Sequence, residues 1–144
     1  ERWLELSLFN DRRNGPGTRL AHRQLVALRP GGAEQFILCE IRWLQLGEDK
    51  VLHVGAKALP GLPQACAVRP RAANALTGPG WVHAFALPLS RGLAPNLVLP
   101  VGWYQQGREL DLKLGEDQFH ICLEELVDRG NDYQRVRFSA VSAG

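Results

Sequence analysis

Short apolar runs with a two-residue period constrain this chain most. The stretch 3–9 places three leucines on one face of a strand, and Glu5 and Ser7 on the other, which is typical of a half-buried strand. Similar runs recur between turns that contain glycine or proline, and no segment keeps a helical period over about three turns. We therefore predict an all-β chain built from small antiparallel β-barrels.

Ten runs qualify as strands, most of them separated by turns that contain glycine or proline. They are 3–9, 24–28, 34–46, 51–59, 64–69, 81–87, 96–100, 108–114, 117–123 and 133–141. Four polar residues at 47–50, between two apolar runs, predict a hairpin. A short helix is the alternative for 121–129, where three apolar residues fall near helical spacing and Gly130 follows.

The stretch 70–80 is rich in glycine and proline, which predicts a linker or a long loop. We expect one β-barrel domain on each side of it, at residues 1–72 and 80–144. An internal repeat supports this division, because 28–39 and 112–122 each run from an apolar strand through a Gly turn to a Phe-containing strand that ends in cysteine. The second domain would then be a degenerate copy of the first. The alternative is that two unrelated hairpins share this alternation.

Charge and composition exclude several classes of protein. Seventeen Lys and Arg against 15 Asp and Glu give a net charge of +2, which is small for a nucleic-acid-binding domain. A nucleic-acid-binding barrel is therefore disfavoured. No apolar run reaches the roughly 18 residues of a membrane span, so we expect no membrane insertion. The basic residues cluster once, at Arg12, Arg13, Arg19 and Arg23.

The cysteines and histidines favour neither a metal site nor catalysis. Three widely spaced cysteines, Cys39, Cys66 and Cys122, give no disulfide framework and no set of four zinc ligands. We interpret them as reduced core thiols of a cytoplasmic protein. His120 and Cys122 would share a strand face, but neighbours in an apolar strand are usually structural. Without a serine-hydrolase elbow or a phosphate-binding loop in the sequence, we expect a non-catalytic protein with no cofactor.

Three of the four tryptophans fall into two groups. Trp43 and Trp81 lie in predicted strands, so we expect them in the core. Trp103 and Tyr104 follow a Pro-Val-Gly segment in a predicted loop. An exposed aromatic pair would suit binding to a protein partner, and a buried one would plug a barrel end. The sequence leaves both interpretations open.

The most unusual stretch is 10–17, with the sequence NDRRNGPG, directly after the first strand. Asn and Asp accept turn geometry, and glycine permits a positive φ. Two adjacent arginines on such a turn, Arg12 and Arg13, can hold a phosphate with paired N–H donors. An ordinary solvated loop with a surface arginine pair is the alternative.

With this turn the chain resembles the PilZ domains, the six-stranded bacterial barrels that serve as cyclic di-GMP receptors. Their [Asp/Asn]-x-Ser-x-x-Gly turn has the spacing of residues 10–15, with Arg12 at the serine position. Their Val/Ile-x-Trp strand corresponds to the sequence IRW at 41–43, and their closing strand, with small residues at its centre, to 53–59. The resemblance covers about residues 2–60.

The resemblance implies a ligand site on the turn. Arg12 and Arg13 would recognise the phosphates and guanines of cyclic di-GMP, while Asn10 and Gly15 would shape the backbone. In the family, an Arg-x-x-x-Arg segment ahead of the first strand supplies the main contacts, and the sequence before residue 3 holds no such segment. The chain also lacks an initiator Met. We therefore expect it to begin inside a barrel, with the family's first strand and this segment upstream.

The resemblance to PilZ domains implies a non-catalytic bacterial signalling module that binds cyclic di-GMP through the turn at 10–15. The alternative is a β-barrel that has lost nucleotide binding and serves only in contact with a protein partner. A small nucleic-acid-binding barrel ranks third because of the near-neutral charge.

Overall fold

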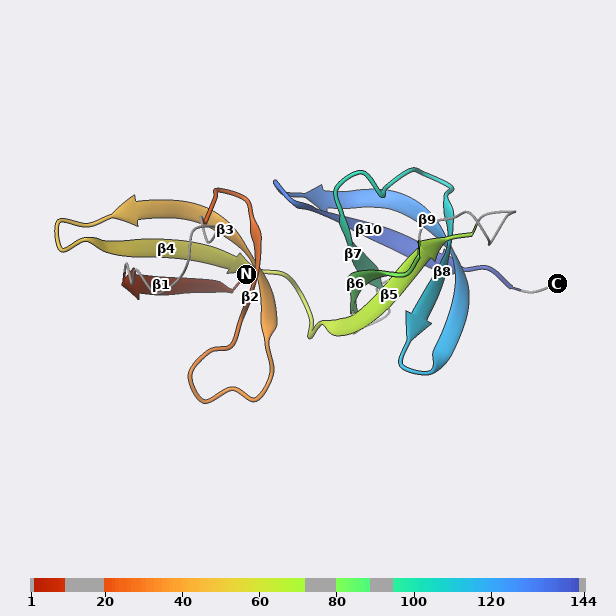
Figure 1. Cartoon of the computed structure of the whole chain (residues 1–144), viewed down its shortest axis with the longest axis horizontal. Helices are drawn as coiled ribbons and strands as arrows, with labels where there is room; N and C mark the ends of the chain where they lie inside the picture. Colours follow the sequence, from red (N-terminus) through yellow and green to blue (C-terminus); the bar gives the residue numbers. More distant parts are fainter. Residues whose placement is uncertain (1, 10–19, 72–79, 89–94, 143–144) are drawn as a thin grey trace. The chain divides into compact units, whose positions relative to one another are not determined.

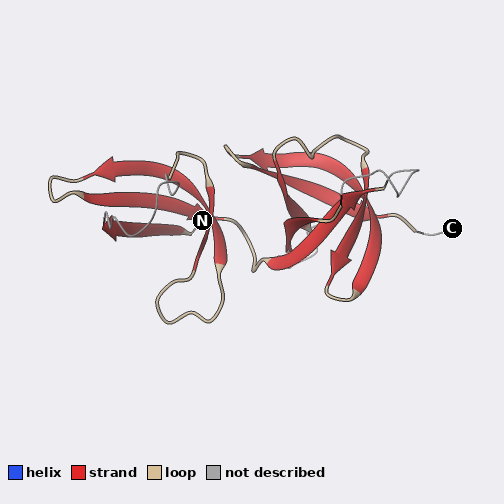
Figure 2. Ribbon diagram, in the orientation of Figure 1, coloured by secondary structure: helices blue, strands red, loops and turns tan. Residues whose placement is uncertain are grey.

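The all-β prediction is confirmed. The computed structural model describes residues 2–9, 20–71, 80–88 and 95–142, and within these ranges the chain forms ten β-strands and no helix (Figures 1 and 2). These ranges accordingly contain no helix long and apolar enough to cross a membrane. The chain divides into two compact units, residues 1–59 with 130–132, and residues 60–129 with 133–144.

The first unit is a four-stranded curled sheet, a half-barrel, with strand order β1-β4-β3-β2 (Figure 1). Its strands are β1 (Trp3–Phe9), β2 (Leu25–Leu28), β3 (Ile37–Leu46) and β4 (Val51–Ala58), all paired antiparallel. The predicted hairpin at 47–50 joins β3 to β4. Its turn is closed by two backbone bonds, from Gly47 N to Val51 O (2.9 Å) and from Lys50 N to Gly47 O (3.1 Å).

One face of the half-barrel carries its apolar core, because strand residues point alternately to the two faces. Ile37, Cys39 and Ala56 are buried there, and partly buried side chains of β1, β2 and β4 pack around them: Leu4, Val26, Leu28 and Ala58. Leu4 of the alternating stretch 3–9 therefore packs on the buried face of the sheet, as the period predicts.

Trp43 lies on the opposite face, so the prediction that it belongs to the core is wrong. The pairing of β3 with β4 shifts between Ile41 and Trp43, which leaves Arg42 as an extra residue. A bulge of one residue turns the following side chains to the other face. The Trp43 side chain is 38% exposed. It lies on Gly55 so closely that a Cβ there would be 2.0 Å from the indole Nε1.

The second unit is a closed antiparallel barrel with strand order β10-β7-β6-β5-β8-β9 (Figure 1). Its strands are β5 (Gln64–Pro70), β6 (Val82–Leu87), β7 (Asn96–Pro100), β8 (Glu109–Leu114), β9 (Asp117–Arg129) and β10 (Tyr133–Ala140). β5 pairs with both β6 and β8. Residues 64–70 are therefore part of this barrel, whereas the sequence-based boundaries of 1–72 and 80–144 assign them to the first domain. The predicted linker at 70–80 lies mostly outside the described residues.

The barrel interior is filled by eleven buried side chains, and all six strands contribute to it. They are Cys66, Val68, Ala84, Ala86, Leu97, Leu99, Leu110, Leu112, Ile121, Leu123 and Val136. In the five strands β5 to β9 the two contributing residues are two apart, and β10 contributes Val136 alone, so this core, like that of the half-barrel, follows the two-residue period of the sequence.

Residues 121–129 continue strand β9, so the alternative prediction of a helix is wrong. β9 pairs with β10 along this stretch, with two register shifts. Val136 stands opposite Leu126, and Phe138 stands opposite Leu123, so β9 has one extra residue between these pairs. Because of this bulge, Leu123 and Leu126 both reach the barrel core although they are three residues apart. A spacing that suggests a helix in the sequence is produced here by an irregular strand.

The aromatic pair after β7 packs against the barrel core, as the plug interpretation predicts. Trp103 and Tyr104 are partly buried there. The Tyr104 hydroxyl donates to the backbone oxygen of Glu124 (2.8 Å). The Arg108 guanidinium lies 5.2 Å from the centroid of the Trp103 ring and donates to the Trp103 carbonyl (2.9 Å). These contacts hold the pair against one end of the barrel.

All three cysteines are free thiols, and two of them lie in the cores. Cys39 is buried in the half-barrel and Cys66 in the barrel. Burial raises the pKa of each of these thiols to about 11, because an apolar environment disfavours the thiolate. Cys122 is half-buried, between the inward-facing Ile121 and Leu123 of β9. The two cysteines aligned by the internal repeat, Cys39 and Cys122, therefore occupy different environments.

The contact between Trp43 and Gly55 predicts that Gly55→Ala destabilises the half-barrel. The added methyl group would meet the indole ring, and overpacking of this kind costs about 1–3 kcal/mol. Urea unfolding followed by tryptophan fluorescence measures the loss. Gly31→Ala is the matched control, since a Cβ at Gly31 meets no atom within 4 Å. Equal stability of both variants and the parent chain would contradict the close packing of Trp43 on Gly55.

The raised thiol pKa values predict selective labelling of the cysteines. At about pH 8, a thiol with a pKa near 11 carries roughly a hundredfold less thiolate than an ordinary cysteine. We expect a disulfide reagent to modify Cys122 first, and Cys39 and Cys66 much more slowly. The slow rates should rise with pH towards about pH 11, because only the thiolate reacts. Mass spectrometry of partially labelled protein identifies the modified cysteines. Early modification of Cys39 or Cys66 would contradict the burial and the raised pKa of that thiol.

Candidate functional site

The four residues predicted to bind ligand, Asn10, Arg12, Arg13 and Gly15, lie within 10–19, outside the described residues. What the structure gives is the strand before them: β1 ends at Phe9, so the sequence of the turn starts immediately after a strand of the half-barrel. The four residues themselves stay a prediction.

Of the arginine cluster 12, 13, 19 and 23, the described residues include only Arg23. Its Nε lies 3.6 Å from the carboxylate of Glu40, and the NH1 of Arg42 lies 3.2 Å from the same oxygen. Glu40 is almost fully buried, at 3% exposure. A buried carboxylate needs such counter-ions, so Arg23 has a structural partner in the sheet.

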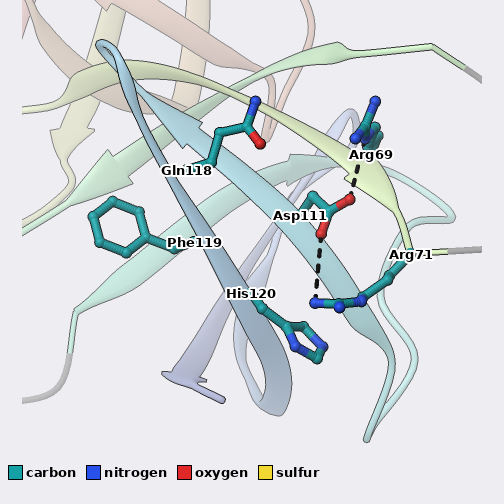
Figure 3. Close-up of a pocket in the computed structure, with 6 residues that line it drawn as sticks. All are labelled: Arg69, Arg71, Asp111, Gln118, Phe119 and His120. Carbon is teal, nitrogen blue, oxygen red and sulfur yellow. Dashed lines mark hydrogen bonds and ion pairs between the residues drawn. The ribbon is translucent and has the colours of Figure 1, made fainter. Parts of the chain in front are cut away.

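The barrel carries a shallow hollow of about 430 Å³ on its outer surface (Figure 3). The residues that line it come from β8, β9 and the end of β5. They are Arg69, Arg71, Asp111, Gln118, Phe119 and His120.

A row of residues in register across three strands forms the centre of the hollow. Arg69 of β5 stands opposite Asp111 of β8, and Asp111 stands opposite His120 of β9. Their neighbours Val68, Leu110 and Ile121 are buried in the barrel core. Because side chains alternate along a strand, burial of these neighbours directs the row outward. The same apolar period that fills the barrel therefore sets the positions of the three polar side chains.

Asp111 is shared by two arginines, whose side chains are both directed at it (Figure 3). Arg69 Nε donates a hydrogen bond to Asp111 Oδ2 at 3.1 Å. Arg71 NH1 lies 3.9 Å from Asp111 Oδ1, beyond hydrogen-bond distance. The Arg69 guanidinium also lies over the Trp81 ring, 4.5 Å from its centroid. Arg69 is thus held on two sides, whereas Arg71, with a half-exposed side chain, is held more loosely.

His120 closes the hollow on the β9 side. Its Nε2 lies 3.4 Å from the Glu109 carboxylate of β8. Phe119 projects from the opposite side of the β9 ribbon (Figure 3) and is 44% exposed. The hollow therefore combines two guanidinium groups, one carboxylate and one imidazole, a combination suited to binding an anion.

One feature of the sequence points to this hollow, the two arginines of Arg69-Pro70-Arg71 at the end of a strand. The spacing of His120 and Cys122 predicts a structural residue of an apolar strand, and no motif includes Asp111. The described ranges contain no group of three or more His, Cys, Asp or Glu side chains that could hold a metal ion. Trp81, which was predicted to be a core residue, is half-buried and covers Arg69.

Comparison with known proteins finds one family in the second half of the chain. The model of the FimW C-terminal beta-barrel domain matches residues 66–141, just over half of the chain. This range holds every residue that lines the hollow. No curated protein matches the chain, and no solved structure matches it. FimW is a bacterial regulator, and its barrel domain is regulatory rather than catalytic. The closed barrel, the position of the match and its extent lead to one conclusion: the chain belongs to the FimW C-terminal beta-barrel domain family.

Proposed function

We propose that this chain is a non-catalytic bacterial signalling module that binds cyclic di-GMP through the turn at residues 10–15. One observation carries the proposal. The sequence of the turn follows β1 of the half-barrel, and the other two elements of the PilZ resemblance, residues 41–43 and 53–59, lie in β3 and β4 of the same half-barrel or directly after them. These two elements are in contact, because Trp43 of β3 lies on Gly55 of β4. Membership of a family of regulatory barrels agrees with a signalling role.

In the proposed mechanism, Arg12 and Arg13 recognise the ligand. Each guanidinium offers a planar set of N–H donors that matches phosphate oxygens and the acceptor edge of guanine. Asn10 and Gly15 would shape the backbone of the turn. The step is binding alone, so no bond of the nucleotide is made or broken.

The same proposal places the protein in the bacterial cytoplasm, with a protein partner that receives the signal. The three free thiols support this location, because disulfides are rare in the reducing cytoplasm. A cytoplasmic location would also give the module direct access to a nucleotide signal.

A second candidate function is contact with a protein partner after loss of nucleotide binding. The observation that favours it is the exposure of Trp3 and Trp43 on the outer face of the half-barrel, at 48% and 38%. Exposed tryptophans are frequent anchors of protein interfaces. One titration with cyclic di-GMP distinguishes nucleotide binding from this second candidate function.

Calorimetric titration of the chain with cyclic di-GMP tests the proposal. At about 100 µM protein, well above the dissociation constants of typical receptors, we expect a saturable heat. Arg12→Ala and Arg13→Ala should each weaken binding by about tenfold or more, since each removes charge-assisted hydrogen bonds.

Arg29→Ala is the matched control, an arginine in the loop between β2 and β3 that stacks on Phe36 and lies outside the turn. It should bind like the parent chain. Absence of heat from folded protein, or an equal loss in the Arg29 control, would reject the turn as the site and favour the protein-contact candidate.

A further inference from the structure

We propose that the hollow between β5, β8 and β9 of the barrel binds the phosphoryl group of a small anionic ligand. Arg71 and Arg69 would be the groups that contact it. This site is independent of the proposed cyclic di-GMP function, because it lies in the other unit of the chain and shares no residue with the turn at 10–15.

Arg69 supplies a preorganised donor. Its guanidinium is fixed by the Asp111 hydrogen bond at 3.1 Å and by the Trp81 ring at 4.5 Å. Only its Nε is used in that hydrogen bond, so its terminal nitrogens remain as the donors for a ligand. A cation held in place by its neighbours loses little conformational entropy when a ligand arrives.

Arg71 supplies the adaptable donor. Its backbone N donates to Glu109 O at 3.2 Å, which anchors the residue beside β8. Its side chain is half-exposed, and its NH1 lies 3.9 Å from Asp111. Movement of this guanidinium towards a phosphoryl group would break no hydrogen bond to Asp111. Two guanidinium groups converging on one carboxylate can also converge on one phosphoryl group, which offers three oxygens.

The Asp111 carboxylate competes with the phosphoryl group of the ligand for the two arginines. Its carboxylate is only 22% exposed and faces both arginines. Among the residues that line the hollow, two guanidinium groups face one carboxylate, a surplus of one positive charge, and the Glu109 carboxylate lies outside this lining, against His120. This surplus attracts an anion, while Asp111 keeps the two arginines together when no ligand is bound.

The shape and polarity of the hollow set the ligand class. A volume of about 430 Å³ falls within the range of small-molecule sites. Charged and polar groups dominate its lining, which excludes an apolar ligand. The open form suits a group that is bound by charge at the surface. Inorganic phosphate and a phosphomonoester share this chemistry.

Titration of ¹⁵N-labelled protein followed by NMR tests the proposal. Inorganic phosphate is the first probe, 5′-GMP the second, and sodium chloride at matched ionic strength the reference. We expect saturable shifts of the side-chain resonances of Arg69, Arg71 and His120 with phosphate, at up to about 10 mM. Tighter binding of 5′-GMP would identify a phosphorylated small molecule as the natural source, and equal binding would identify free phosphate.

Two substitutions in the hollow should act in opposite directions. Arg71→Gln should weaken phosphate binding about tenfold, since it removes charge-assisted hydrogen bonds. Asp111→Asn keeps an acceptor for Arg69 and removes the competing charge, so it should tighten binding about threefold. A carboxylate with a purely structural role would give the reverse effect for Asp111→Asn.

Arg137→Gln is the matched control, an arginine of β10 on the same barrel that pairs with Glu125 outside the hollow. It should bind phosphate like the parent chain. The proposal is overturned if chloride shifts the same resonances equally, if the control loses as much as Arg71→Gln, or if Asp111→Asn weakens binding in a folded protein.

Discussion

Closure of the barrel depends on hydrogen bonding along both edges of β9. Its first half pairs with β8, from Asp117 to Cys122, and its second half pairs with β10, from Ile121 to Arg129. A strand that changes partner along its length must bend, and the two register shifts against β10 provide that bend. Because the sheet closes on itself, it has no edge strand, and each strand of the barrel pairs with one neighbour on either side. The eleven apolar side chains inside then fix which positions of each strand face outward.

The hollow follows directly from this closure. Arg69, Asp111 and His120 come from three different strands and meet only because β8 pairs with both β5 and β9. An arrangement held by backbone register is more rigid than one on a loop, which suits a site whose ligand is recognised by the spacing of two charges. The half-barrel has a different design. Its proposed ligand residues come directly after β1 in the sequence and lie outside the described residues.

Much of the fold could be predicted from the sequence, because burial of one face imprints a two-residue period on every strand. Predictions of burial from the two-residue period were wrong where a bulge interrupts a strand. At Arg42 one extra residue turned Trp43 outward, and in β9 one extra residue gave Leu123 and Leu126 a helical spacing. The assignment of β5 to the barrel could not be predicted, since strand partners are chosen by long-range packing. The hollow could not be predicted for the same reason. Its charged side chains come together only when β5, β8 and β9 pair in this register, whereas along the chain Arg69 and Asp111 are far apart. The four residues of the predicted turn site remain a prediction.

The central functional claim is that the half-barrel, through the turn at 10–15, is the part of this chain that binds cyclic di-GMP. A residue-by-residue map of backbone amide shifts, recorded on the whole chain during titration with cyclic di-GMP, tests it most directly. The account predicts that the largest saturable shifts fall on residues 10–15 and on the end of β1, with smaller changes in the barrel. Shifts confined to β5, β8 and β9 would contradict it, and so would an unchanged spectrum of the folded chain.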